Sequence, residues 1–204
     1  MAKNRKGCCR WAGLPNPDLI AEMLAGLESP RAGVKFGAST ALRNLSGESP
    51  ELLSPHFDRI ALQLAQPNQI LLWNALLTLA NLAKVDGGGK IEGLLEQYLR
   101  LIRGPSMITA TNAIRGAAVI GLAKPELAPG IVTSVMGVAR AKFAKPECVH
   151  VAIGHALKAL AQLVPVLPDP RAVCRFAQRQ LDSPWPATRK KAERIVASFS
   201  SRAA

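Results

Sequence analysis

The sequence of 204 residues predicts an all-α protein in which about five two-helix units stack into a solenoid. The first observation is a repeat: the segment FGASTALRNLS returns as WNALLTLANLA and then twice more, at offsets of 37, 38 and 40 residues. The second is that Pro50, Pro125 and Pro165 superpose at the same offsets, although they played no part in choosing the register. The third is a composition of 49% hydrophobic but only 4% aromatic residues, which suits closely packed helices. The positions that superpose are Ala38, Ala41, Leu42 and Leu45; Ala75, Thr78, Leu79 and Leu82; Ala113, Gly116, Ala117 and Ile120; and Ile153, Ala156, Leu157 and Leu160.

Each unit is expected to contain two amphipathic helices separated by a short turn. Proline marks nearly every turn, because it has no amide proton and restricts the residue before it. The expected helices are, in chain order, 18–27 and 34–46; two within 54–83, broken at 66–68; two within 90–123, broken at 104–106; 131–141 and 148–163; and two within 169–199, broken at 182–186. The repeat register predicts burial of Ala38, Leu42, Leu79, Leu82, Leu157 and Leu160.

The pattern divides the chain into an arm and one repeat domain. Residues 1–17 are basic and lack periodicity, so we expect a disordered N-terminal arm, while residues 18–204 are expected to form a single domain. Three consecutive glycines at 87–89 predict the most flexible joint in the array. The last helix has one apolar stripe and is otherwise charged, as expected where no further repeat covers it.

The sequence predicts no cofactor, no metal and no membrane span. The cysteines lack the C-x-x-C spacing of metal sites, and His150 and His155 are five residues apart, on different faces of a helix. The start of the chain is basic rather than apolar, and the longest apolar run, 70–83, is too short to cross a bilayer. A cytoplasmic protein with reduced thiols is therefore expected.

The segment LIAEMLAGLESPRAGVKFGASTALRNLSGESPELL resembles a HEAT or armadillo repeat, with its proline turn, its small residues inside the second helix and its A-L-x-N-L-S ending. The resemblance implies a right-handed α-α superhelix whose second helices line a concave groove. In armadillo proteins an Asn near the end of that helix holds the backbone of an extended peptide, and Asn44 and Asn81 match it. In the next two units the equivalent residues are Val119 and Ala159.

The second helices also nominate a row of candidate partner-binding residues beside the buried positions. The row mixes one Trp, several amides and a few basic side chains, a composition that suits a groove for a protein partner. Its members are Asn44, Trp73, Asn74, Asn81, Asn112, Arg115 and His155.

The net charge of +12 lies at the two ends of the chain. Residues 1–17 carry four basic and no acidic side chains, residues 18–139 are neutral overall, and residues 140–204 carry twelve basic against four acidic side chains. Arg171, Arg175 and Arg179 are spaced by four residues and so form one ridge, which attracts polyanions. Nucleic acid and an acidic partner are therefore the candidate ligands of the basic C-terminal end. The predicted basic patch comprises Arg171, Arg175, Arg179, Arg189, Lys190, Lys191 and Arg194.

Three functions are compatible with this pattern. The first is a non-enzymatic scaffold or adaptor that binds a protein partner in the concave groove. The second is a nucleic-acid-binding HEAT-like protein that uses the basic C-terminal repeats; a DNA-glycosylase-like enzyme is less favoured, because the concave row contains no Asp or Glu. The third is an enzyme subunit or cofactor lyase, which no constellation of Cys, His or carboxylates supports.

Overall fold

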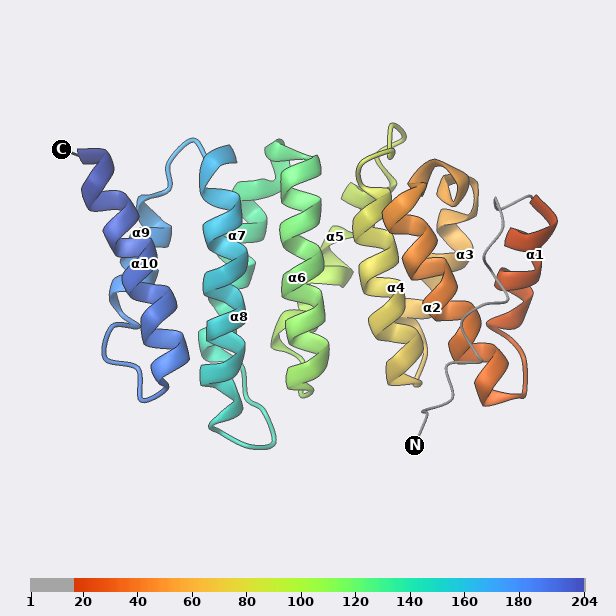
Figure 1. Cartoon of the computed structure of the whole chain (residues 1–204), viewed down its shortest axis with the longest axis horizontal. Helices are drawn as coiled ribbons and strands as arrows, with labels where there is room; N and C mark the ends of the chain where they lie inside the picture. The colour runs from red at the N-terminus through yellow and green to blue at the C-terminus, as the bar shows by residue number, and fades with distance from the viewer. Residues whose placement is uncertain (1–16, 204) are drawn as a thin grey trace, which may run out of the picture. The chain divides into compact units, whose positions relative to one another are not determined.

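The computed structural model describes residues 17–203, with side chains described as far as residue 200. These residues form ten α-helices joined by loops and 3-10 turns, and none of them lies in a strand. The all-helical prediction is therefore confirmed for this part of the chain. The chain divides into two compact units, unit 1 up to Val85 and unit 2 from Asp86 onward (Figure 1). The division falls beside the triple glycine at 87–89, whereas the single repeat domain over 18–204 stays a prediction.

The expected arm, residues 1–17, lies almost entirely outside the described residues. Its last residue, Pro17, belongs instead to the first helix. Proline is favoured at the first position of a helix, because the amide proton that it lacks would have no partner there.

Unit 1 contains two helix pairs. The first pair is α1 (Pro17–Gly26) and α2 (Ala32–Glu48), and the second is α3 (Phe57–Ala61) and α4 (Gln69–Leu82). α3 is shorter than expected, because 3-10 turns at Ser54–His56 and Leu62–Ala65 flank it. Asn68 fixes the start of α4, where its side-chain oxygen accepts the amides of Ile70 and Leu71 at 3.0 and 3.3 Å. Helix α2 packs against both α1 and α4.

Unit 2 contains three helix pairs in two layers. The first helices are α5 (Lys90–Arg100), α7 (Ala128–Met136) and α9 (Arg171–Gln178); the second helices are α6 (Met107–Ala123), α8 (Cys148–Leu163) and α10 (Pro186–Ala203). α6 packs against α8, and α8 packs against α10; we call these three helices the second-helix layer of unit 2 (Figure 1). α7 begins three residues before the expected Ile131, because Pro129 falls in its first turn, where proline is tolerated.

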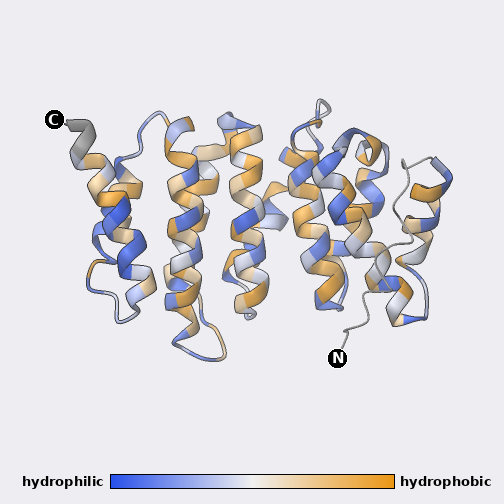
Figure 2. Cartoon of the chain, in the orientation of Figure 1, coloured by the Kyte–Doolittle hydropathy of each residue, from blue (hydrophilic) through white to orange (hydrophobic). Residues whose placement is uncertain are grey.

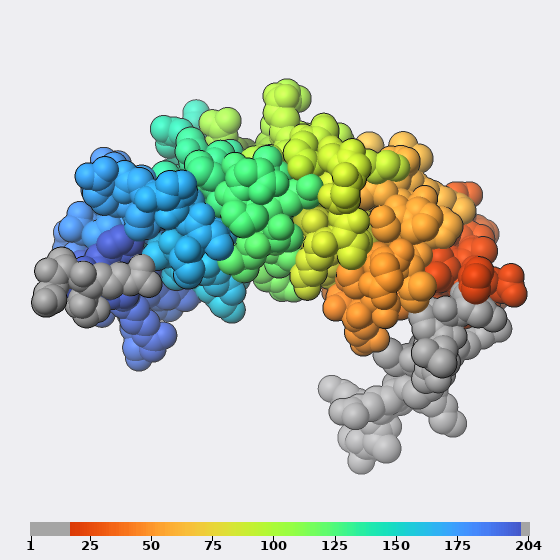
Figure 3. Space-filling model, turned by 90° about the horizontal axis from the view of Figure 1, so that it is seen from above, coloured from red at the N-terminus to blue at the C-terminus, as the bar shows by residue number. Residues whose placement is uncertain are grey.

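The repeat register predicted the core correctly. Ala38, Leu42, Leu79, Leu82, Leu157 and Leu160 are each at most 3% exposed. The rest of the core is mainly Ala, Leu, Ile and Val, as the low aromatic content predicted. In Figure 2 the ribbon of α10 carries more blue than α6, in keeping with the predicted polar outer face of the last helix. In the space-filling view, the green and light-blue atoms of unit 2 lie in close contact with one another (Figure 3).

Two glycines allow the second helices of unit 2 to approach closely. A Cβ on Gly121 of α6 would lie 2.7 Å from Leu163 Cδ2, and one on Gly154 of α8 would lie 2.9 Å from Thr188 Oγ1 of α10. Neither distance leaves room for a methyl group. The close approach brings α10 side chains onto the backbone of α8: Thr188 donates to the His150 carbonyl at 3.0 Å, and Lys191 donates to the Gly154 carbonyl at 2.9 Å.

Unit 2 begins with a charged cap. The Asp86 carboxylate accepts the amides of Lys90 and Ile91 at 3.1 and 2.9 Å, at the start of α5. Lys124, at the end of α6, lies 3.6 Å from Asp86 and 2.8 Å from Glu92. Burial alone raises the pKa of Asp86, but the two amides and the Lys124 ammonium lower it by more, so the net shift is downward.

The segment Cys148–Val166 has the length and hydropathy of a membrane span. Eight of the α8 residues in it are buried inside unit 2, among them Ala152, Leu157 and Leu160. Helix packing therefore accounts for its apolar character.

Candidate binding surface

The row predicted on unit 1 contains a buried residue. Asn74 of α4 donates to Ser39 Oγ at 2.8 Å and to Thr40 Oγ1 at 3.4 Å on α2. Its own oxygen accepts from Arg43 at 3.1 Å. The amide of Asn74 is therefore occupied in joining the two second helices of unit 1.

The other predicted residues of unit 1 lie nearer the surface. Asn81, which matches the peptide-binding Asn of armadillo repeats, is half-buried and donates to Ser46 Oγ at 3.0 Å. Asn44 is exposed, with its oxygen 3.3 Å from Arg43 Nη2, and Trp73 is half-buried. The row in unit 1 thus combines the buried Asn74 with the half-buried Trp73 and Asn81 and the exposed Asn44.

In unit 2 the predicted row meets part of the predicted basic patch. Arg115 on α6 and His155 on α8 are exposed, while the half-buried Asn112 donates to the Ile108 carbonyl of its own helix at 3.0 Å. The pKa of His155 is lowered by burial and then by the positive charges of Lys191, Lys158 and Arg115. The charges of these three side chains therefore act on the His155 imidazole. The sequence had assigned Lys191 to a separate patch.

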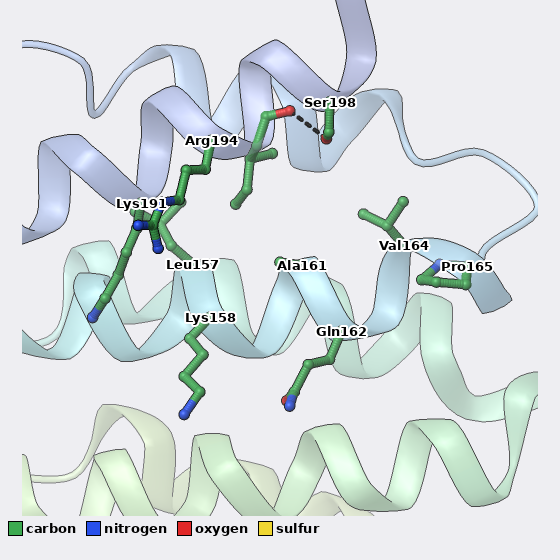
Figure 4. A pocket seen from close by; sticks show the side chains of 10 residues that line it. Leu157, Lys158, Ala161, Gln162, Val164, Pro165, Lys191, Arg194 and Ser198 are labelled. Carbon is green, nitrogen blue, oxygen red and sulfur yellow. Dashed lines mark hydrogen bonds between the residues drawn. The ribbon is translucent and has the colours of Figure 1, made fainter. Parts of the chain in front are cut away.

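A cavity of about 580 Å³ lies between α8 and α10 beside this cluster (Figure 4). Its size falls within the range of ligand pockets, roughly 300 to 1,000 Å³. Lys191 and Arg194 project from α10, whereas Lys158 and Gln162 project from α8 on the side away from α10 (Figure 4). The lining residues are Leu157, Lys158, Ala161, Gln162, Val164, Pro165, Lys191, Arg194, Ile195 and Ser198.

Two names are used below for this part of unit 2. The apolar floor is the set of carbon side chains in the cavity: Leu157, Ala161, Val164, Pro165 and Ile195. The basic rim is the set of basic side chains on and beside it: Arg115, His155, Lys158, Lys191 and Arg194.

The remaining residues of the basic patch face elsewhere. Arg175 of α9 and Arg179, directly after α9, line a second cavity of about 480 Å³. Arg140, which ends the 3-10 turn after α7, also lines it. Arg171 pairs with Asp169 at 2.9 Å, which holds the pKa of that carboxyl at about 2. Arg189 donates to the Ser183 carbonyl at 3.2 Å, and Lys190 is exposed. The linear patch is thus divided between two cavities and several local contacts.

Metal ligands do not gather in the part of the chain that the structure describes. Across residues 17–200, no group of three or more His, Cys, Asp or Glu side chains is placed to hold an ion. Cys148 and Cys174 are free thiols.

Comparison with known proteins is informative only at the level of fold. No protein-family model matches the chain, and no curated protein matches it. A designed armadillo repeat protein, solved in complex with the peptide (KR)4, superposes with a TM-score of 0.57 at 14% identity, over 89% of this chain and 82% of that one. The fold is that of an armadillo-like helical repeat. The crystal structure of an engineered protein matches it with a TM-score of 0.54 at 16% identity, over 90% of this chain and 80% of that one.

Proposed function

We propose that this armadillo-like protein is a non-enzymatic, cytoplasmic adaptor that binds a peptide segment of a partner protein on its second helices. The observation that carries the proposal is the cavity between α8 and α10, which combines an apolar floor with charged side chains at its edge. Peptide-binding sites commonly share this combination, because the floor supplies affinity and the polar edge supplies orientation.

The likeness to a designed armadillo protein in complex with a peptide supports the same function. The Asn side chains of unit 1, however, are engaged within the protein. Asn74 and Asn81 of this chain direct their amides to α2, so an Asn ladder along unit 1 has few donors left for a peptide backbone. Asn44 and Trp73 remain candidate contacts there, and the cavity of unit 2 is the stronger site.

Nucleic-acid binding is the second candidate, favoured by the eight excess positive charges of residues 140–204. A nucleic-acid backbone needs a continuous run of cations, whereas the cations of unit 2 line two different cavities. Affinity for single-stranded DNA should therefore be weak and should vanish near physiological salt. Submicromolar affinity at about 150 mM salt would favour the nucleic-acid function instead.

Selection from a phage library of random short peptides tests the proposal on the full chain. We expect enriched peptides to lose at least about tenfold in affinity for Ala161→Trp, because Ala161 is exposed and the indole fills the cavity without disturbing the core. Ala139→Trp is the matched control, an exposed alanine that lines the cavity beside Arg175 and Arg179 instead. Trp73→Ala reports separately on unit 1.

Failure to enrich any peptide would refute the function. Enriched peptides that bind Ala161→Trp normally and lose affinity for Ala139→Trp would move the site away from the second helices.

A further inference from the structure

The basic rim is charged on three helices and has no neutralising carboxylate in the cavity. Arg115 lies on α6, His155 and Lys158 on α8, and Lys191 and Arg194 on α10. Among the described residues that line the cavity, three are basic and none is acidic. Glu193 precedes Arg194 in the chain but is not among the lining residues.

The rim cations repel one another rather than pair. The three charges that act on His155 are all positive, and its pKa lies below the ordinary value after burial has lowered it. Burial lowers the pKa of Lys191 as well, and the charge of Lys158 lowers it further. The ammonium of Lys191 is held by a neutral partner, the Gly154 carbonyl at 2.9 Å. An anion bound here would therefore relieve repulsion that the protein itself leaves in place.

The floor selects a different kind of group. Among the apolar lining residues, Ala161, Val164 and Pro165 offer carbon surface, while Leu157 and Ile195 are buried beneath them. Only Gln162 and Ser198 add uncharged polar side chains. The described lining contains no aromatic side chain on which a nucleobase would stack. An aliphatic side chain gains free energy by leaving water for such a surface, whereas a phosphate or a base does not.

The basic rim and the apolar floor together favour one kind of ligand, and this inference rests on the proposed peptide-binding function. We infer that the cavity takes an acidic segment of a partner protein, with one aliphatic side chain on the apolar floor and flanking carboxylates at the basic rim. The charge preference is opposite to that of the designed armadillo protein, which was solved with a peptide of Lys and Arg. The selectivity resides in Lys158, Lys191 and Arg194, which belong to both the rim and the cavity lining.

Four labelled probes test the inference against the full chain by fluorescence anisotropy. The first is an alternating Glu-Asp peptide with one central Leu, and the second replaces that Leu by Ser. The third is (KR)4, and the fourth is oligo-dT of similar length. We expect the Leu peptide to bind at least about fivefold more tightly than the Ser peptide, since the leucine side chain leaves water for the apolar floor. We expect no measurable binding of (KR)4.

Two variants with matched controls locate the site. Arg194→Glu should weaken the Leu peptide about tenfold, because it replaces an attraction by a repulsion. Lys190→Glu changes another exposed cation of the same helix that does not line the cavity, and should have at most about a twofold effect. Ala161→Trp should reduce the affinity for the Leu peptide to that for the Ser peptide, while Ala139→Trp should not. Circular dichroism confirms that each variant is folded.

The outcomes separate this inference from the function on which it rests. Equal binding of the Leu and Ser peptides would overturn the inference, and so would an Arg194→Glu effect no larger than that of Lys190→Glu. Tighter binding of (KR)4 than of the acidic peptides would also overturn it, while leaving peptide binding intact. Tighter binding of oligo-dT, lost in Arg194→Glu, would replace both proposals by nucleic-acid recognition.

Discussion

The two units join their second helices by different means. In unit 1 a polar network links α2 and α4: Asn74 contacts Ser39, Thr40 and Arg43, and Asn81 contacts Ser46. In unit 2 the helices approach at Gly121 and Gly154, where the missing Cβ leaves room for Leu163 of α8 and Thr188 of α10. Between α8 and α10, two side chains of α10 then reach backbone carbonyls of α8.

The difference shows that one repeat pattern accommodates two kinds of helix contact. Polar side chains that bond to each other between two helices have used their donors and acceptors, so they have fewer left for a bound partner. In unit 2 a member of the basic rim lies at one of these two glycines: Lys191 donates to the Gly154 carbonyl and also lines the cavity. The proposed binding cavity therefore lies in the unit whose second helices meet at glycines rather than through a network of side-chain amides.

The largest expected effect tests what the units share. Leu79→Ala in unit 1 and Leu157→Ala in unit 2 should each lower the free energy of unfolding by about 2 to 5 kcal/mol, because both leucines are 0% exposed. Chemical denaturation of each variant measures the loss. A change below about 1 kcal/mol at either position would mean that the core register is wrong in that unit.

A smaller effect tests the polar network of unit 1. Asn74→Ala should cost about 1 to 3 kcal/mol of stability, since it removes three hydrogen-bonding contacts and leaves Ser39 and Arg43 without this partner. Asn112→Ala is the control in unit 2, because its amide contacts only its own helix in the bonds described. Equal effects of the two substitutions would remove the distinction between the units.

The glycine contact of unit 2 is tested by Gly154→Ala. The new methyl group would meet Thr188 Oγ1 at 2.9 Å, so we expect a loss of about 1 to 2 kcal/mol. Gly93→Ala on α5 has nothing within 4 Å and should instead stabilise the protein by about 0.5 to 1 kcal/mol. Thermal unfolding distinguishes a loss of stability from a gain. A gain in stability for Gly154→Ala would show that α10 can move to accommodate the methyl group.

The smallest effect concerns pH. Burial and three neighbouring cations lower the pKa of His155 in the folded protein below its ordinary value of 6.5. The unfolded chain therefore binds more protons as the pH falls below about 6.5, and the free energy of unfolding decreases there. His155→Gln should show a shallower decrease between about pH 7.5 and pH 5.5 in denaturation curves. Parallel curves for the two proteins would place the cations too far from the imidazole to matter.

The repeat register made the fold predictable from sequence, because small and large residues recur wherever helices meet. The same register could not show that Asn74 is buried, since it lies one residue before the superposed Ala75, at the edge of the inward face. The buried Ser39 and Ser46 were the available signal, because polar residues on an inward face need partners.

The candidate site was only partly predictable. Arg115, His155, Lys191 and Arg194 were named from the sequence, but in two separate groups, because linear spacing does not show which cavity a helix lines. Lys158 and the apolar floor were missed. The sequence carries only a weak indication of these residues. Lys158, Ala161 and Gln162 share one face of α8, with a small side chain between two long polar ones. Such a pattern produces a cavity only where another helix packs beside it.

The contact between Lys191 and the Gly154 carbonyl also bears on the thermodynamics of recognition. It ties one wall of the cavity to the backbone of the other, so the width of the cavity is set before any ligand arrives. A preformed receptor loses little conformational entropy on association. The ordering cost of binding therefore falls mainly on the ligand, and a segment that is already rigid in its partner gains the most.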